Sequence, residues 1–192
     1  MLLPIHKDTK LLIFDCDGTI INNMSAHIEA WGKVLTKHSL DLPLSDLSRF
    51  NGLPSEYILA HLYPHKKESF ETIAYELKET TYGLLHKSEP IQPVVDLIEK
   101  YKGKIPMVVI SGGKRKNVLR SLDILKITDY FAEIITADDN HPTKNTTDAF
   151  TLLAKKYKVE PKQCHVFEDG VTGLINALEA GMTVTDVRNI EL

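Results

Sequence analysis

The sequence predicts an α/β protein whose core is a doubly wound, five-stranded parallel sheet of the Rossmann-like type. Short apolar runs rich in Ile, Val and Phe indicate buried strands, and segments with helical periodicity lie between most of them. Apolar strands that alternate with helices are typical of a parallel sheet covered on both faces, and right-handed crossovers favour the doubly wound topology. The expected strands are residues 11–15, 105–110, 133–136, 164–168 and 183–187.

The stretch between the first two expected strands breaks this alternation. Residues 23–88 contain no convincing strand, but they contain several segments with helical periodicity. A crossover between parallel strands needs only one helix, so these residues are predicted to form an all-helical subdomain inserted after the first strand. The α/β core is then expected to comprise residues 1–22 and 89–192. Three helices are expected to follow strands of this core, over residues 117–122, 148–157 and 173–180.

Length and composition exclude several classes of protein. The 192 residues suit one sizeable domain or a medium domain with a small insertion, and 43% hydrophobic with 26% charged residues excludes a disordered chain. A net charge of −3 gives no electrostatic reason to expect nucleic acid or an anionic membrane as partner. No apolar run is long enough to cross a bilayer, the N-terminus lacks a signal-peptide core, and Cys16 and Cys164 form no disulfide framework. We therefore expect a cytoplasmic protein; the oligomeric state stays open, with a monomer as the simplest expectation.

Two carboxylates follow the first expected strand. Asp15 and Asp17 are two residues apart, so in an extended chain both side chains point to the same side, toward the crevice where open α/β sheets bind ligands. Gly18 permits a sharp turn and a close approach of the backbone to a ligand. The alternative is an ordinary Asp-Gly turn at a strand end. A calcium loop is excluded, because Gly18 directly follows the second acid, whereas that loop needs one further residue and a third Asp or Asn before its glycine.

Three other expected strands or loops carry polar groups suited to phosphate or metal. Ser111, Gly112 and Lys114 follow the second strand, where a hydroxyl, backbone N–H groups and an ammonium group suit phosphate oxygens. Lys144 follows the third strand. Glu168 and Asp169 end the fourth strand, and these hard oxygen donors without a His or Cys cluster favour Mg²⁺ over zinc. Taken singly, each of these segments has a structural alternative. Ser111 and Gly112 can belong to an ordinary strand-to-helix turn, and Lys144 can be a solvated lysine. Glu168 and Asp169 can simply be favourable charges at a helix N-terminus.

Along the chain, the motifs follow one another as an Asp-x-Asp pair, a serine, a lysine and a Glu-Asp pair. In this order they resemble the motifs of the haloacid dehalogenase (HAD) superfamily of phosphotransferases. The resemblance implies that Asp15 attacks phosphorus and becomes an aspartyl phosphate, while Asp17 is the general acid and base. It implies that Ser111 and Lys144 bind the phosphate and offset its charge. It further implies that Mg²⁺ is held by Asp15, the backbone carbonyl of Asp17, Asp169 and, directly or through water, Glu168. Asn145 departs from the family pattern, which usually has Pro after the lysine.

The helical insertion resembles the small cap of the β-phosphoglucomutase-like branch, and the chain as a whole is most similar to its fructose-1-phosphate phosphatase-like members. This implies a small phosphorylated metabolite, such as a sugar phosphate, as substrate. Ser55 stands where the branch's mutases have an Arg for a second phosphate, which favours hydrolysis over a phosphoglucomutase reaction. A non-catalytic phosphoacceptor is the alternative from another class. The substrate-binding residues implied by the resemblance are Gly18, Thr19, His27, Gly52, Gly112 and Lys114.

Overall fold

The computed structural model describes residues 3–41, 47, 55–66 and 70–190. The chain divides into two compact units, one formed by Met1–Asn22 with Glu89–Leu192 and the other by Asn23–Ser88. The first is the α/β unit and the second the helical unit. A short antiparallel pair, β2 (Ile21–Asn22) with β3 (Glu89–Pro90), joins the points where the chain leaves and re-enters the α/β unit.

The α/β unit contains a five-stranded parallel sheet in the order β5-β4-β1-β6-β7. This topology confirms the predicted fold class. The central strand, β1, pairs with β4 on one side and β6 on the other, so segments far apart in the sequence end side by side at the carboxyl edge of the sheet. The strands are β1 (Leu11–Phe14), β4 (Met107–Ile110), β5 (Glu133–Ile135), β6 (Cys164–Glu168) and β7 (Thr183–Asp186).

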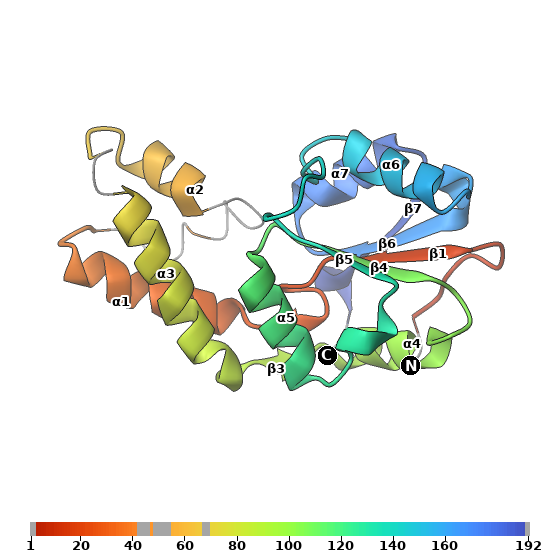
Figure 1. Cartoon of the computed structure of the whole chain (residues 1–192), viewed down its shortest axis with the longest axis horizontal. Coiled ribbons are helices and arrows are strands. Elements are labelled where there is room, and N and C mark those ends of the chain that lie inside the picture. The colour runs from red at the N-terminus through yellow and green to blue at the C-terminus, as the bar shows by residue number, and fades with distance from the viewer. Residues whose placement is uncertain (1–2, 42–46, 48–54, 67–69, 191–192) are drawn as a thin grey trace. The chain divides into compact units, whose positions relative to one another are not determined.

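Helices cover both faces of this sheet (Figure 1). Alternate residues of β1 face opposite sides: Leu12 and Phe14 belong to one apolar cluster, Leu11 and Ile13 to the other. The first cluster includes side chains of α4 (Gln92–Tyr101) and α5 (Arg115–Ile124), and the second includes those of α6 (Asp148–Lys156) and α7 (Val171–Glu179). All four residues of β1 are fully buried, which explains the continuous apolar run that predicts the strand.

In the described residues of the helical unit, three α-helices surround an apolar core that includes Trp31, Leu59, Ile73 and Leu77. Trp31 is thus part of the packing face of its helix. The helices are α1 (Met24–Lys37), α2 (Ser55–Leu62) and α3 (Phe70–Leu84). Short 3₁₀ helices elsewhere in the chain cover Leu85–Lys87, Thr128–Tyr130, Pro161–Gln163 and Val187–Asn189.

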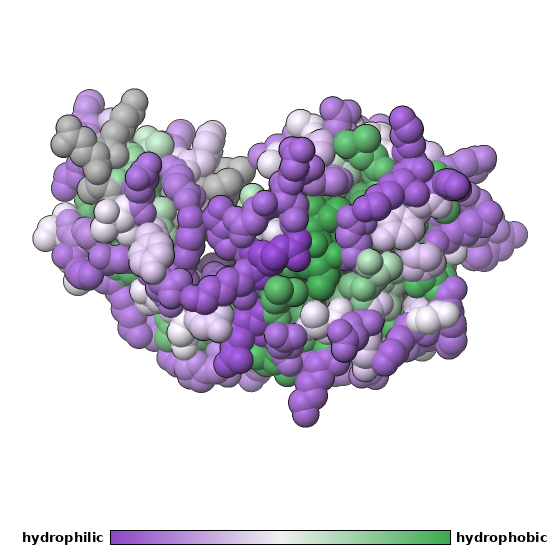
Figure 2. Space-filling view, in the orientation of Figure 1, coloured by the Kyte–Doolittle hydropathy of each residue, from purple (hydrophilic) through white to green (hydrophobic). Residues whose placement is uncertain are grey.

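Hydrophilic side chains cover much of the visible face of each unit (Figure 2). Within the described residues, none of the helices combines the length and the apolar character needed to span a bilayer.

A buried histidine on β6 gives the fold a pH-dependent stability. The His165 ring is 5% exposed, and its Nδ1 and Nε2 lie 2.8 Å from the hydroxyls of Thr183 and Thr185. The Thr183 hydroxyl donates to the Cys164 carbonyl, so it accepts from Nδ1–H, and Nε2 accepts from Thr185. The structure therefore holds one neutral tautomer, and burial lowers the pKa of His165 from 6.5 to about 4.

We expect the free energy of unfolding to fall as the pH drops from 6.5 toward 4, because in that range the unfolded chain binds a proton at His165 that the native state does not. In His165→Asn this contribution is absent. Between pH 7 and pH 5 the unmodified protein should lose about 2 kcal/mol more than the variant in urea unfolding. Carboxylates that titrate in the same range do so in both proteins, and equal losses would contradict the assignment.

Candidate active site

The candidate site begins at the tight turn that follows β1. Asp15 is buried, and its backbone N–H donates to the Phe167 carbonyl at 3.0 Å, which extends the pairing of β1 with β6. The chain then reverses at Gly18, where φ is +83°, a conformation that glycine adopts without a steric penalty. The Gly18 N–H donates to the Ile21 carbonyl at 2.9 Å and closes the turn. This local geometry places Asp15 at the carboxyl edge of the central strand.

Lys144 links two carboxylates in the interior of the site. Its Nζ donates to Asp15 Oδ1 and, at 2.6 Å, to Glu168 Oε2. None of these three side chains is more than 11% exposed. Burial alone would lower the pKa of Lys144, but Asp15 and Glu168 outweigh it and raise that pKa above its ordinary value. Burial raises the pKa of Asp15 well above its ordinary value, an effect that Lys144 opposes. Lys144 is therefore a permanent cation next to Asp15.

Glu168 is held at the N-terminus of α7. Its Oε1 accepts hydrogen bonds from the backbone N–H groups of Asp169 and Gly170, at 3.1 and 2.8 Å. Free N–H groups and the helix dipole both favour a negative charge there. One oxygen of Glu168 is thus bound to α7 and the other to Lys144, so the carboxylate fixes the position of the ammonium group.

Asp169 adds a third carboxylate to this cluster. Its Oδ1 accepts a hydrogen bond from the Thr19 hydroxyl at 3.2 Å. Burial, together with the neighbouring charge of Glu168, raises the pKa of Asp169 to about 6. Oxygen atoms of Asp15, Glu168 and Asp169 lie within 4.8 Å of one another. Two buried carboxylates and the half-buried one of Asp169, beside one ammonium group, leave an excess of negative charge, and hard oxygen donors of this kind fit Mg²⁺.

Ser111 and Asp17 lie beside each other next to Gly113. The Ser111 Oγ accepts a hydrogen bond from the Gly113 N–H at 3.0 Å. A Cβ at Gly113 would lie 3.2 Å from Asp17 Oδ2 and 3.3 Å from Ser111 Oγ, so both side chains approach this position. Ser111 follows β4, which pairs directly with β1. The second acid of the Asp15–Asp17 pair and the serine hydroxyl are thus at the same edge of the sheet.

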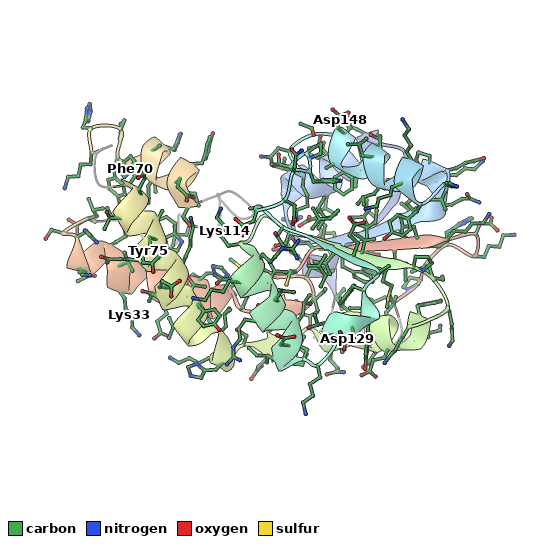
Figure 3. The ribbon with its side chains drawn as sticks, in the orientation of Figure 1. Lys33, Phe70, Tyr75, Lys114, Asp129 and Asp148 are labelled. Atoms are coloured by element: carbon green, nitrogen blue, oxygen red, sulfur yellow. The ribbon has the colours of Figure 1, made fainter. Side chains whose placement is uncertain are left out.

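Lys114 lies at the start of α5 (Figure 3), and it forms an ion pair with Asp138. Its Nζ lies 2.8 Å from Asp138 Oδ1, and the neighbouring Arg115 guanidinium donates to both oxygens of Asp139 at 2.7 Å. Hydrogen bonds from Arg115 and Thr136 lower the pKa of Asp139 to about 2. These pairs tie the loop after β4 to the loop after β5. The Lys114 ammonium therefore binds a protein carboxylate here, and its contact with a substrate stays a prediction.

Direct contacts join half of the predicted site residues of the α/β unit. Thr19 is fully buried and bound to Asp169, which differs from the substrate contact expected for it. His27 is half-buried on α1 in the helical unit, and its contact with a substrate stays a prediction. Gly52 lies outside the described residues. Direct contacts unite Asp15, Thr19, Lys144, Glu168 and Asp169, while Asp17, Gly18, Ser111 and Gly112 belong to the two adjoining turns.

Gly173 is a site residue that sequence reasoning missed. A Cβ at this position in α7 would lie 2.5 Å from Glu168 Oε2 and 2.8 Å from its carboxyl carbon. The signal was present, since a glycine in the first turn of a helix lowers helix propensity and needs a packing reason.

Gly173→Ala is expected to displace the Glu168 carboxylate and to lower the free energy of unfolding by about 1–3 kcal/mol, the usual cost of overpacking. Because Glu168 holds Lys144, catalytic activity should fall as well. Denaturant unfolding measures the first effect. The matched control is Gly83→Ala in α3, where a Cβ would have no neighbour within 4 Å and where alanine should stabilise the helix by about 0.5–1 kcal/mol. Equal behaviour of the two variants would contradict the packing argument.

Comparison with known proteins identifies the family. Residues 12–187 match the family model described as haloacid dehalogenase-like hydrolase. The chain is 34% identical to fructose-1-phosphate phosphatase YqaB of Escherichia coli over 185 residues, which cover 92% of this chain and 95% of the relative. It is 24% identical to a phosphorylated carbohydrates phosphatase of Thermotoga maritima, covering 89% of this chain and 81% of that protein.

Among solved structures, the fold is similar to that of a β-phosphoglucomutase from Clostridium difficile, with a TM-score of 0.78 and 23% identity over 92% of this chain and 83% of that one. The family match covers every residue of the acidic cluster and the lysine between its members. The chain therefore belongs to the haloacid dehalogenase-like hydrolase family, as the order of its motifs indicates.

Proposed function

We propose that the protein is a Mg²⁺-dependent phosphatase that hydrolyses a small phosphorylated metabolite, of the sugar phosphate class, through an aspartyl-phosphate intermediate. The observation that carries this proposal is the buried Asp15 carboxylate, bound by Lys144 and grouped with the carboxylates of Glu168 and Asp169. An isolated buried carboxylate is costly, and it persists where a function or a partner compensates it.

In the proposed first step, a carboxylate oxygen of Asp15 attacks phosphorus, and the bond between phosphorus and the ester oxygen breaks. Asp17 gives its proton to the departing oxygen, so the product leaves as an alcohol. In the second step, Asp17 takes a proton from water, whose oxygen attacks the same phosphorus and releases inorganic phosphate and free Asp15. Lys144 offsets the charge of the phosphoryl oxygens, and the Ser111 hydroxyl donates to one of them.

Asp15, Glu168 and Asp169 would hold Mg²⁺, together with the backbone carbonyl of Asp17. Bound Mg²⁺ would offset the repulsion between the carboxylates and the phosphate dianion. The excess of carboxylates over ammonium groups supports a divalent cation at this place. Both carboxylate oxygens of Glu168 are in hydrogen bonds, one with Lys144 and the other with the α7 N-terminus, so we assign direct metal binding to Asp15 and Asp169 and a direct or water-mediated role to Glu168.

The proposed substrate class rests on the relatives whose names refer to fructose 1-phosphate and to phosphorylated carbohydrates. The helical unit would act as a cap that excludes water, and His27 would bind the sugar. Ser55, the first residue of α2, has no cation to clamp a second phosphate, which favours hydrolysis over transfer between sugar positions. Cys16 and Cys164 are buried free thiols, which are typical of a reducing compartment. Together with a small soluble metabolite as substrate, they support a cytoplasmic enzyme.

The test is a phosphate-release screen across sugar phosphates, nucleotides and phosphoglycolate, with Mg²⁺ and with EDTA. We expect Mg²⁺-dependent release to be fastest with a sugar phosphate and to be absent with EDTA. Product analysis of the same reactions separates the alternatives. A phosphorylated isomer without free phosphate would indicate a mutase, and a phosphorylated protein stable for hours would indicate a phosphoacceptor module. Either result would overturn the proposal.

A further inference from the structure

Thr19 is the predicted substrate residue whose surroundings differ most from that role. Its side chain is fully buried, and its hydroxyl donates to Asp169 Oδ1 at 3.2 Å. A carboxylate oxygen accepts hydrogen bonds but does not donate, so the single hydroxyl hydrogen of Thr19 points toward Asp169. While it donates to Asp169, the Thr19 hydroxyl cannot donate to a phosphate oxygen of a substrate.

We propose that Thr19 is a positioning residue that fixes the Asp169 carboxylate for binding the divalent cation, an inference that rests on the Mg²⁺ site of the proposed function. Lys144 holds the other two carboxylates of the cluster, Asp15 and Glu168. Asp169 has a neutral donor instead. A hydroxyl orients the carboxylate without neutralising it, so the full negative charge of Asp169 stays available to the cation.

The turn after β1 gives Thr19 a fixed position. The Thr19 N–H donates to the Cys16 carbonyl at 3.3 Å, and the N–H groups of Ile20 and Ile21 converge on the same carbonyl at 2.9 and 3.2 Å. The turn also restricts Asp169 from the other side, because a Cβ at Gly18 would lie 2.5 Å from Asp169 Oδ2. One oxygen of Asp169 thus lies on the Thr19 hydroxyl and the other above the Gly18 backbone.

This arrangement has an energetic consequence. A free aspartate loses rotational freedom when it binds a cation, whereas Asp169 is already restricted by the Gly18–Thr19 turn. Loss of an outer partner of a metal ligand typically costs 10–100-fold in metal affinity. The turn that contains Asp15 and Thr19 therefore also restricts the side-chain orientation of Asp169, which lies 150 residues after Thr19 in the sequence.

The experiment compares Thr19→Val, which keeps the shape and removes the hydroxyl, with Thr19→Ser, which keeps the hydroxyl. Isothermal titration calorimetry of each folded full-length protein with Mg²⁺ alone gives the dissociation constant. We expect Thr19→Val to raise it about 10–100-fold and Thr19→Ser to leave it close to that of the unmodified protein. Should Thr19→Val fail to fold, Thr19→Ala removes the hydroxyl without placing a second methyl group against the carboxylate.

Steady-state kinetics add a readout that a purely structural role would not move. Loss of the hydroxyl should raise the Mg²⁺ concentration that gives half-maximal activity, while KM for substrate at saturating Mg²⁺ stays unchanged. If instead KM rises and Mg²⁺ affinity does not, Thr19 contacts the substrate and the inference is wrong. Unchanged Mg²⁺ affinity in Thr19→Val, or no Mg²⁺ binding by the unmodified protein, would also overturn it.

The calorimetric comparison needs no substrate, so it is separate from the test of the proposed function. Weaker Mg²⁺ binding by Thr19→Val in a protein without phosphatase activity would support the positioning role and overturn the proposed reaction. Mg²⁺-dependent phosphatase activity with equal affinities in the two proteins would support the reaction and overturn the role of Thr19.

Discussion

Asp15→Asn is expected to reduce phosphate release by at least about 10⁴-fold, because the amide has the shape of the carboxylate but lacks the charge that attacks phosphorus. The loss should appear in kcat rather than in KM, and no phosphorylated protein should accumulate when the reaction is quenched with acid. The measurement is phosphate release on the best substrate of the screen, with Mg²⁺ at saturation.

Folding is not expected to limit this variant. The amide oxygen of the variant can still accept a hydrogen bond from Lys144, and Lys144 keeps the buried carboxylate of Glu168 as its charged partner. Thermal unfolding within a few degrees of the unmodified protein would establish that the loss is chemical. Activity within tenfold of the unmodified protein would exclude Asp15 as the nucleophile.

Lys144→Met should impair both stability and catalysis. Methionine fills a similar volume, but it leaves Asp15 and Glu168 buried without the ammonium group that joins them. Breaking a buried ion pair from one side typically costs about 3–5 kcal/mol, so the variant should unfold at clearly lower denaturant concentration. Phosphate release should fall by about 10²–10³-fold, the usual effect of losing one donor to the developing negative charge.

Lys156→Met is the matched control for this prediction. Lys156 also forms a lysine–glutamate pair, with Glu133 at 2.6 Å, but its side chain is 60% exposed. Exposed pairs contribute about 0–1 kcal/mol, so this variant should remain close to the unmodified protein in stability and activity. Equal destabilisation by the two substitutions would show that the buried position of Lys144 does not matter, and would remove the basis for its proposed role.

The sheet could be predicted because its strands are fully buried and therefore continuously apolar. The strand ends were harder to place, since backbone pairing decides where a strand begins. Residues 105–110 were expected to form one strand, whereas β4 begins at Met107. Pro106 precedes it and has no N–H to donate, although its carbonyl accepts from Leu12. The amphipathic helix α4 was not predicted, although Val94, Val95, Leu97 and Ile98 have helical spacing.

The site was predictable where its residues end strands, and less so where side chains cross between loops. Asp15, Glu168 and Asp169 follow from the parallel topology, since neighbouring strands end at one edge. That Lys144 bridges two of these carboxylates depends on the path of a loop between β5 and α6, which no local pattern specifies. For the same reason, the pairing of Lys114 with Asp138 could not be foreseen from either residue alone.

The central place of β1 between β4 and β6 has a consequence for how the protein acquires activity during synthesis. Asp15, the proposed nucleophile, is synthesised well before the neighbouring strand β6 and the acidic pair Glu168–Asp169, which follow about 150 residues later. Pairings so distant in sequence raise the contact order and slow folding. A nascent chain that ends before residue 164 would lack one side of β1, so chemistry can begin only when nearly the whole domain has been made.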